Sequence, residues 1–144
     1  MQRIADAMTR GAHTLTPNDK LTTAAQAMNE YDIGALPVCD GGRLVGMVTD
    51  RDLVVRGVAK GVVPDEAVVA SVMSPDVCCC YEDEPVADAM DRMRREQIRR
   101  MPVVDREQHL VGMLALGDLA TKHDDAGGTG QALRDISTPA EPAH

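Results

Sequence analysis

The stretch Gly46-Met-Val-Thr-Asp-Arg-Asp52 predicts the end of a β-strand followed by the start of a helix. Apolar residues lead into Thr49, and Asp52 stands three positions later at the head of an apolar run. A threonine and an acid at this spacing suit a capping box, in which each side chain accepts a hydrogen bond from the backbone N–H of the other residue. Because short motifs of this kind are common, a purely structural role and a ligand-binding role both stay open at this point.

The same neighbourhood occurs twice in the chain. Leu36-Pro-Val-Cys-Asp40 aligns with Met101-Pro-Val-Val-Asp105 at a separation of 65 residues, and Leu44-Val-Gly-Met47 aligns with Leu110-Val-Gly-Met113 at 66. The 65-residue separation also holds upstream, where it pairs Met8 with Met73, Leu21 with Val86, Ala24 with Ala89, Met28 with Met93 and Ile33 with Ile98. The chain is therefore a tandem duplication.

Length and composition limit the class of protein. A half of the 144-residue chain buries too little surface to be stable alone, so we expect the two halves to share a core. There is no Phe or Trp, which makes that core aliphatic, with nine Met as adaptable filler. The net charge of −8 disfavours binding to nucleic acid or to anionic membranes. Without an apolar run of about 20 residues or a signal-peptide pattern, we expect a cytoplasmic protein.

Each half predicts the order strand, helix, strand, strand, helix. The apolar periodicity and the turn residues indicate lead-in helices at 1–9 and 66–73, strands at 14–16, 34–39, 44–48 and 77–81, amphipathic helices from Leu21 and from Val86, and a helix at 52–60 that ends at Gly61. The predicted class is α+β, with two pseudo-symmetric β-α-β-β-α repeats packed through their sheets. We expect repeat 1, with its lead-in helix, at 1–62, repeat 2 at 63–123 and a flexible tail at 124–144.

The cysteines and histidines do not form a metal-binding pattern. Cys39 and the run Cys78-Cys79-Cys80 have no Cys-x-x-Cys spacing, and the four histidines are scattered. Adjacent cysteines in a strand point to opposite faces, so we expect buried or half-buried reduced thiols. A redox role for the three consecutive thiols stays open.

The repeated pattern of an early Met, an amphipathic helix, Leu-Pro-Val-x-Asp, a turn and Leu-Val-Gly-Met-Val-Thr-Asp-Arg-Asp resembles the CBS (cystathionine-beta-synthase) domain. Two in tandem resemble the CBS pair, or Bateman module, over residues 1 to about 122. The length is also similar to that of small stand-alone hypoxic-response-type CBS proteins of actinobacteria. The resemblance implies a non-catalytic regulatory or sensing module that forms a homodimer. By this resemblance we expect no required cofactor, and we expect AMP, ADP, ATP or S-adenosylmethionine to bind between the repeats.

The resemblance also assigns residues to two sites that differ in chemistry. In the first site the Thr49 hydroxyl meets phosphate, Asp52 meets the ribose hydroxyls, and the remaining residues line the pocket: Arg51, Cys79, Ile98, Arg99, Arg100, Met101 and Pro102. A carboxylate only accepts hydrogen bonds, so Asp52 suits a ribose diol, while the arginines suit phosphate. The second, weaker site takes Asp118 with Thr14, Ile33, Gly34, Ala35 and Pro37. It lacks a facing cation, and Ala115 replaces the hydroxyl.

Structural alternatives exist for several of these residues. Arg92, Arg94 and Arg95 stand near Asp91 and Glu96 and are expected to form ion pairs on a solvated helix face. For Arg99 and Arg100, ligand binding and simple solvation both stay open, and Leu36 and Met101 are expected to belong to the core.

Three functions remain to be compared. The leading hypothesis is a regulator that binds an adenine nucleotide and acts on a protein partner that the sequence does not identify. The alternative is an interaction scaffold that binds no nucleotide. An enzyme is the least favoured, because no nucleophile with a base, no metal cluster and no catalytic carboxylate pair can be found.

Overall fold

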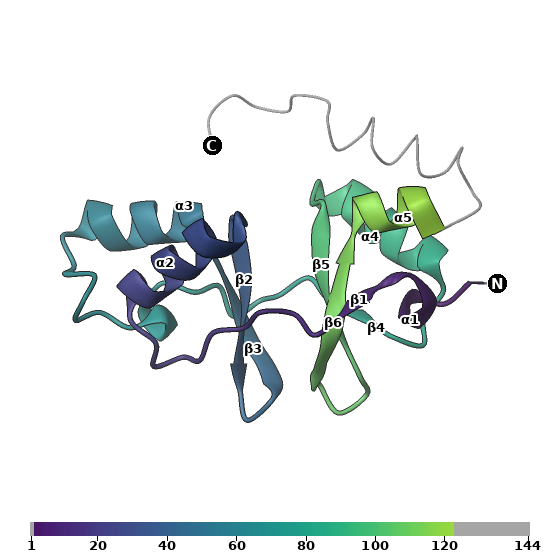
Figure 1. Cartoon of the computed structure of the whole chain (residues 1–144), viewed down its shortest axis with the longest axis horizontal. Helices are drawn as coiled ribbons and strands as arrows, with labels where there is room; N and C mark the ends of the chain where they lie inside the picture. Colours follow the sequence, from purple (N-terminus) through teal and green to yellow (C-terminus); the bar gives the residue numbers. More distant parts are fainter. Residues whose placement is uncertain (1, 123–144) are drawn as a thin grey trace. The chain divides into compact units, whose positions relative to one another are not determined.

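We describe the protein from a computed structural model, which defines the backbone of residues 2–122 and the side chains of residues 2–119. The chain divides into two compact units (Figure 1). The terminal unit takes Met1–Ala12, Cys78–Glu107 and Val111–His144, and the central unit takes His13–Val77 and Gln108–Leu110. The predicted tail at 124–144 lies outside the described residues. No described helix has the length and hydropathy needed to cross a membrane.

The terminal unit contains a four-stranded sheet covered by helices. Its strands are β1 (Thr9–Arg10), β6 (Leu110–Ala115), β5 (Arg100–Val104) and β4 (Cys80–Tyr81), in that order across the sheet. The pair β1–β6 is antiparallel, and the pair β4–β5 is parallel. The helices are α1 (Ile4–Ala7), α4 (Val86–Glu96) and α5 (Leu116–Lys122). The parallel pair flanks α4 in the chain, as a strand–helix–strand crossover requires.

The central unit is built around the hairpin of β2 (Ala35–Asp40) and β3 (Arg43–Thr49). Gly41 and Gly42 both adopt positive φ, of 60° and 83°, and form the hairpin turn that Asp40-Gly41-Gly42 predicts from the sequence. The helix α2 (Leu21–Tyr31) follows the loop after Leu15, which forms a parallel bridge with Val38. The segment after β3 contains α3 (Asp50–Asp52), a π-helix (Leu53–Gly57) and a 3-10 turn (Val58–Lys60), and a further 3-10 turn covers Val69–Ser71.

The mixed α+β class is confirmed, but several predicted elements are wrong in extent. The lead-in helix predicted at 66–73 is only the 3-10 turn Val69–Ser71. The predicted stretch contains three β-branched valines, and the Ser71 hydroxyl donates back to the Val68 carbonyl at 2.7 Å. The strand predicted at 14–16 is a single bridge at Leu15, and that at 77–81 is limited to Cys80–Tyr81. The helix predicted at 52–60 widens into a π-helix around Gly57, although it ends at Gly61 in the left-handed conformation, as expected.

Each lead-in segment, 1–9 and 66–73, packs in the unit that is built mainly from the other sequence repeat. The N–H groups of Ile4 and Val86 donate to the carbonyls of Glu84 and Gln2, at 2.9 and 3.0 Å. The equivalent residues of the central unit repeat this pattern, because Val69 donates to Asp19 at 2.7 Å and Leu21 donates to Ala67 at 3.1 Å. The first lead-in therefore belongs to the unit that contains the second repeat, and the second lead-in belongs to the other unit.

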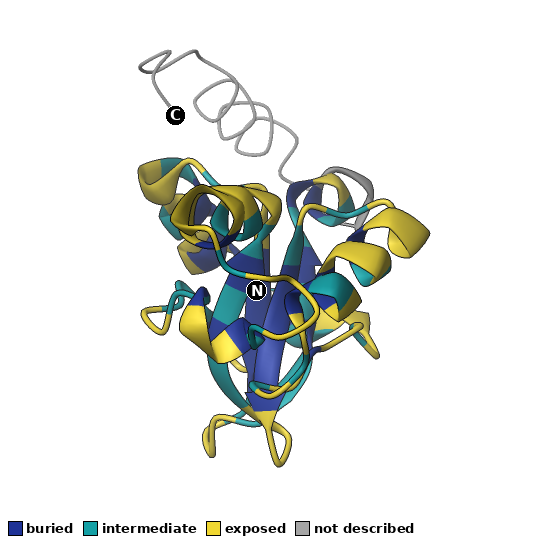
Figure 2. Ribbon diagram, turned by 90° about the vertical axis from the view of Figure 1, so that its left-hand side faces the viewer, coloured by how far each residue is buried: buried dark blue, intermediate teal, exposed yellow. Residues whose placement is uncertain are grey.

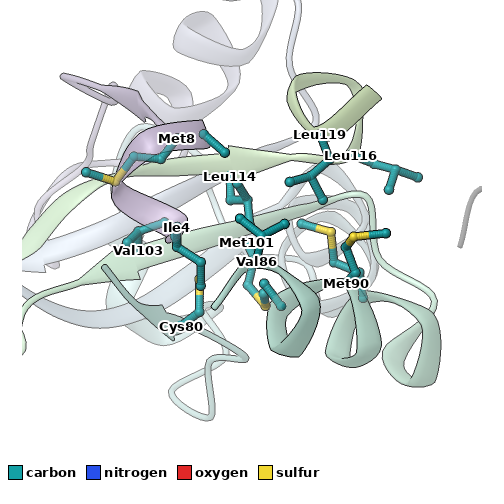
Figure 3. Close-up of a cluster of buried hydrophobic side chains, with 13 residues drawn as sticks. Ile4, Met8, Cys80, Val86, Met90, Met101, Val103, Leu114, Leu116 and Leu119 are labelled. Carbon is teal, nitrogen blue, oxygen red and sulfur yellow. The ribbon is translucent and has the colours of Figure 1, made fainter. Parts of the chain in front are cut away.

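The two halves share their buried side chains, as expected, but in two clusters, one in each unit, instead of a single core. In the terminal unit, Ile4 and Met8 lie among residues of the second repeat such as Met101 and Leu114 (Figure 3). In the central unit, Val69 and Val72 join residues of the first repeat. The middle residues of β2 and β5 are buried, while the hairpin tips and outer helix turns are exposed (Figure 2). Since each core takes side chains from both sequence halves, neither half contains a complete core of its own.

Candidate functional site

Thr49 and Asp52 form the predicted capping box at the end of β3. The Thr49 N–H donates to Asp52 Oδ2 at 2.9 Å, and the Asp52 N–H donates to Thr49 Oγ1 at 3.0 Å. The second carboxylate oxygen, Oδ1, lies 3.9 Å from the Nε of Arg56. The Asp52 side chain is 15% exposed, so it is held in place but still reaches solvent. The cap uses only part of the acceptor capacity of the carboxylate, and a ligand hydroxyl can still bind it.

The central unit also brings Gly34 and Ala35 next to Thr49. Ala35 pairs with Thr49 in the β2–β3 ladder, and the Asp50 N–H donates to the Gly34 carbonyl at 2.9 Å. A Cβ at position 34 would lie 3.0 Å from the Asp50 carboxylate, so a larger residue here would displace that side chain. Of the other residues predicted for the second site, Pro37 is buried, Ile33 is half-buried and Thr14 is exposed.

The terminal unit holds the residues predicted to face Thr49 and Asp52. Arg99 and Arg100 are exposed at the start of β5, whereas Met101 and Pro102 are buried. The Arg99 carbonyl accepts a hydrogen bond from the Leu116 N–H at 2.8 Å, which fixes this strand start against α5. Ile98 packs against the hydrophobic cluster and Cys79 is half-buried. The two arginines therefore project from a rigid strand end, while Met101 belongs to the core, as predicted.

The predicted first site draws its residues from both units. Thr49, Arg51 and Asp52 are close together in the central unit. The run from Ile98 to Pro102 begins β5 of the terminal unit, which also contains Cys79. Each half of the site is well defined within its own unit, and their combination into one pocket stays a prediction.

Asp118 of the terminal unit accepts a hydrogen bond from a hydroxyl that was not predicted from the sequence. Its Oδ2 accepts from the Ala115 N–H at 3.4 Å and from the Thr9 hydroxyl at 3.4 Å. Thr9 belongs to β1, which pairs with β6. Thr9 of the exchanged lead-in thus brings a hydroxyl to Asp118 as a donor to the carboxylate, whereas the Thr49 hydroxyl accepts from the Asp52 N–H. The duplication could have pointed to Thr9, because Thr9 aligns with Ser74 and a residue with a hydroxyl follows the repeated methionine in both halves.

The arginines of α4 divide into two groups. Arg94 and Arg95 pair with Asp91 at 3.6 and 3.9 Å on the surface, which confirms the predicted solvated ion pairs. For Arg92 that prediction is wrong. Its guanidinium binds the Glu84 carboxylate and the Cys79 carbonyl, and its side chain is only 28% exposed. Arg92 lies on the side of α4 that faces the loop after β4, so it joins the helix to that loop.

The cysteines are free, and all four are buried or half-buried, as expected. Burial raises the pKa of each thiol, and for Cys80 it raises the pKa to about 12 despite the opposing effect of Arg92. The nucleophilic and metal-binding form of cysteine is the thiolate, which is scarce at neutral pH when the pKa is raised. Among residues 2–119, no three His, Cys, Asp or Glu side chains group as metal ligands.

Comparison with known proteins identifies the family. The CBS domain profile matches residues 4–58 and 69–124, most of the chain. The chain belongs to the CBS domain family. Among curated relatives of this CBS pair, the CBS domain-containing protein YhcV of Bacillus subtilis is 39% identical over 137 residues, or 95% of this chain and 96% of the relative. Hypoxic response protein 1 of Mycobacterium tuberculosis is 37% identical over 121 residues, or 83% of this chain and 84% of the relative.

Solved structures of CBS proteins have the same fold as this pair. Hypoxic Response Protein I, solved with two coordinated zinc ions, has a TM-score of 0.76 at 36% identity and covers 84% of this chain and 98% of its own. CBSX2 in complex with AMP has a TM-score of 0.75 at 27% identity, covering 84% and 95%. The CBS domain pair of protein MJ0100, in complex with 5-methylthioadenosine and S-adenosyl-L-methionine, has a TM-score of 0.70 at 26% identity, covering 84% and 94%.

Proposed function

We propose that this CBS pair is a regulatory module that binds an adenosine-containing ligand, such as AMP, ADP, ATP or S-adenosylmethionine, and performs no catalysis itself. In the proposed site Asp52 accepts hydrogen bonds from the ribose hydroxyls, Thr49 lies beside the phosphate, and Arg99 or Arg100 neutralises the phosphate charge. The single observation that carries the proposal is the Asp52 carboxylate, which is held by the Thr49 N–H at one oxygen, while no backbone N–H of residues 2–119 donates to the other oxygen.

The chemistry of this carboxylate supports a sugar rather than a phosphate contact. An ionised carboxylate repels phosphate but accepts both hydroxyls of a diol. The cap fixes its orientation before any ligand arrives, which reduces the entropy lost on binding. The complexes of CBSX2 with AMP and of MJ0100 with two adenosine derivatives support the ligand class, since both proteins share the fold of this chain.

A thermal-shift titration with AMP, ADP, ATP and S-adenosylmethionine tests the proposal. A ligand present at a hundred times its dissociation constant stabilises the folded state by about 2.7 kcal/mol, which gives an easily measured rise in melting temperature. We expect Asp52→Ala to abolish this rise. The matched control is Asp118→Ala, which changes the equivalent acid of the other repeat and should leave the rise almost unchanged. A melting temperature that none of the four ligands moves would refute the proposed function.

The second candidate is an interaction scaffold, and the surface of the central unit favours it. Val54, Val55, Val58 and Val63 are 43% to 63% exposed. Of these, Val58 also lines a largely apolar pocket of about 320 Å³ beside α2 and the π-helix, whose other lining residues are Leu21, Thr22, Ala25, Gln26, Asn29, Leu53 and Pro64. Clustered apolar surface often marks a contact between proteins. A scaffold that acts through a homodimer or another partner is therefore the interpretation that remains if no nucleotide binds.

A further inference from the structure

Arg56 is bound to two parts of the central unit that are distant in sequence. Its Nε lies 3.9 Å from Asp52 Oδ1, and its Nη1 donates to the carbonyls of Val72 and Met73, both at 3.4 Å. The same guanidinium thus touches the acid of the proposed ribose site and the end of the exchanged lead-in. A guanidinium has five N–H donors in a fixed plane and stays charged at neutral pH, so it can hold all three acceptors together.

The two carbonyls lie just before the chain leaves the central unit. Val72 ends the 3-10 turn Val69–Ser71, and carbonyls at such an end lack partners within the turn. The next residue after Met73 is fixed to β3, because Ser74 and Met47 exchange backbone hydrogen bonds of 2.8 and 3.0 Å. The central unit ends at Val77, and the terminal unit resumes at Cys78. Arg56 therefore contacts the connecting segment 72–77 at its first two residues.

We propose that Arg56 couples ligand occupancy at Asp52 to the connecting segment 72–77. This inference rests on the proposed function of the same site. A ribose diol that donates to Asp52 competes with Arg56 for Oδ1, to which no backbone group in the described part of the chain donates. The guanidinium then moves closer to the carbonyls of Val72 and Met73 and strengthens those long hydrogen bonds. Ligand binding thus tightens a segment that leads from the central unit to the terminal unit, and by linkage a tightened segment favours the ligand.

The chain contains a control for a simple ion-pair effect. Arg95 lies 3.9 Å from Asp91, through the same Nε atom and at the same separation of four residues. Both arginines are more than half exposed, with 52% of Arg56 and 67% of Arg95 accessible. Only Arg56 has the additional hydrogen bonds to backbone carbonyls of a distant segment. A difference between variants at the two positions therefore reports those bonds and not the loss of one surface charge.

Amide hydrogen exchange, followed by NMR, tests the coupling. The amides of Ser74, Asp76 and Val77 are measured with and without AMP, and likewise with and without S-adenosylmethionine, while calorimetry gives the dissociation constants. In the unchanged protein, ligand should slow exchange at these amides. In Arg56→Gln exchange should be faster from the outset and no longer respond to ligand, while affinity should rise by up to about fivefold, the low end of typical allosteric couplings, because the group that competes for Oδ1 is gone. Arg95→Gln should behave like the unchanged protein.

Two results would overturn the inference while leaving the proposed function intact. One is ligand binding without slower exchange in the unchanged protein, and the other is a full ligand response in Arg56→Gln. Arg56→Lys keeps the charge but not the planar set of donors, so it should show a reduced response and provides the test if Arg56→Gln proves unstable. If neither AMP nor S-adenosylmethionine binds the unchanged protein, both the proposed function and this coupling fail.

Discussion

The two compact units place the same acid at the start of the helix after their hairpin, but the hydroxyl beside that acid has a different origin. In the central unit, Thr49 ends β3 and caps Asp52 within three residues. In the terminal unit, Ala115 ends β6, and Thr9 of the exchanged lead-in supplies the hydroxyl for Asp118. The central unit uses a local contact, while the terminal unit uses one between residues 109 positions apart.

This difference shows how the duplicated halves have come to depend on each other. The first lead-in supplies Ile4, Ala7 and Met8 to the core of the terminal unit as well as Thr9 to its acid. The second lead-in supplies Val69 and Val72 to the central unit. A change in one sequence repeat should therefore destabilise the unit formed mainly by the other repeat.

The largest expected effect comes from Ile4→Ala, which tests this dependence directly. Ile4 is fully buried among residues of the second repeat. Removing its side chain leaves a cavity and should lower the free energy of unfolding by about 2 to 5 kcal/mol. Hydrogen exchange should accelerate in α4 and β5 of the terminal unit more than in α2 and β2 of the central unit.

Val69→Ala is the matched control, because Val69 is the equivalent residue of the second lead-in and is also fully buried. Its smaller side chain predicts a loss of about 2 kcal/mol, with the faster exchange now in α2 and β2. If each variant instead accelerated exchange in the repeat that contains it in sequence, the exchange of lead-ins would be contradicted.

Local patterns were sufficient to predict most of the elements. The apolar stripes of α2 and α4 and the Gly41-Gly42 turn each depend on residues close together in the chain. The capping box of Thr49 and Asp52 was predictable for the same reason. The exchange of lead-ins was not, because Ile4 and Val69 are both apolar and periodicity does not indicate which core each one enters. The contact of Thr9 with Asp118 depends on that exchange and was missed with it.

The next effect depends on pH and should be largest at Cys80 of the terminal unit. Burial raises the pKa of Cys80 to about 12 from an ordinary value of 9.0, whereas the equivalent residue of the central unit is Leu15, which does not titrate. Between pH 9 and 12 the unfolded chain releases this proton and the folded protein retains it. The free energy of unfolding should therefore decrease as pH rises, by about 1.4 kcal/mol at pH 10 from this thiol alone.

Urea unfolding of the unchanged protein and of Cys80→Val at pH 8 and pH 10 measures this contribution. All other side chains are common to the two proteins, so the relevant quantity is the difference between their pH dependences. The variant should lose less stability over this interval. Equal losses in the two proteins would show that the Cys80 thiol ionises in the folded state as readily as in the unfolded chain.

The smallest expected effects come from Thr49→Val and Thr9→Val, which compare the two hydroxyls directly. Valine keeps the β-branched shape of threonine in a strand, so each change removes mainly the hydroxyl. Loss of the cap at Thr49, where the Asp52 N–H donates at 3.0 Å, should cost about 1 kcal/mol in urea unfolding. Loss of the exposed Thr9 contact, at 3.4 Å, should cost less than about 0.5 kcal/mol. If Thr9→Val lowered the free energy of unfolding as much as Thr49→Val or more, the distant hydroxyl would hold its acid as firmly as the local cap does. The two units would then differ in the origin of this contact but not in its strength.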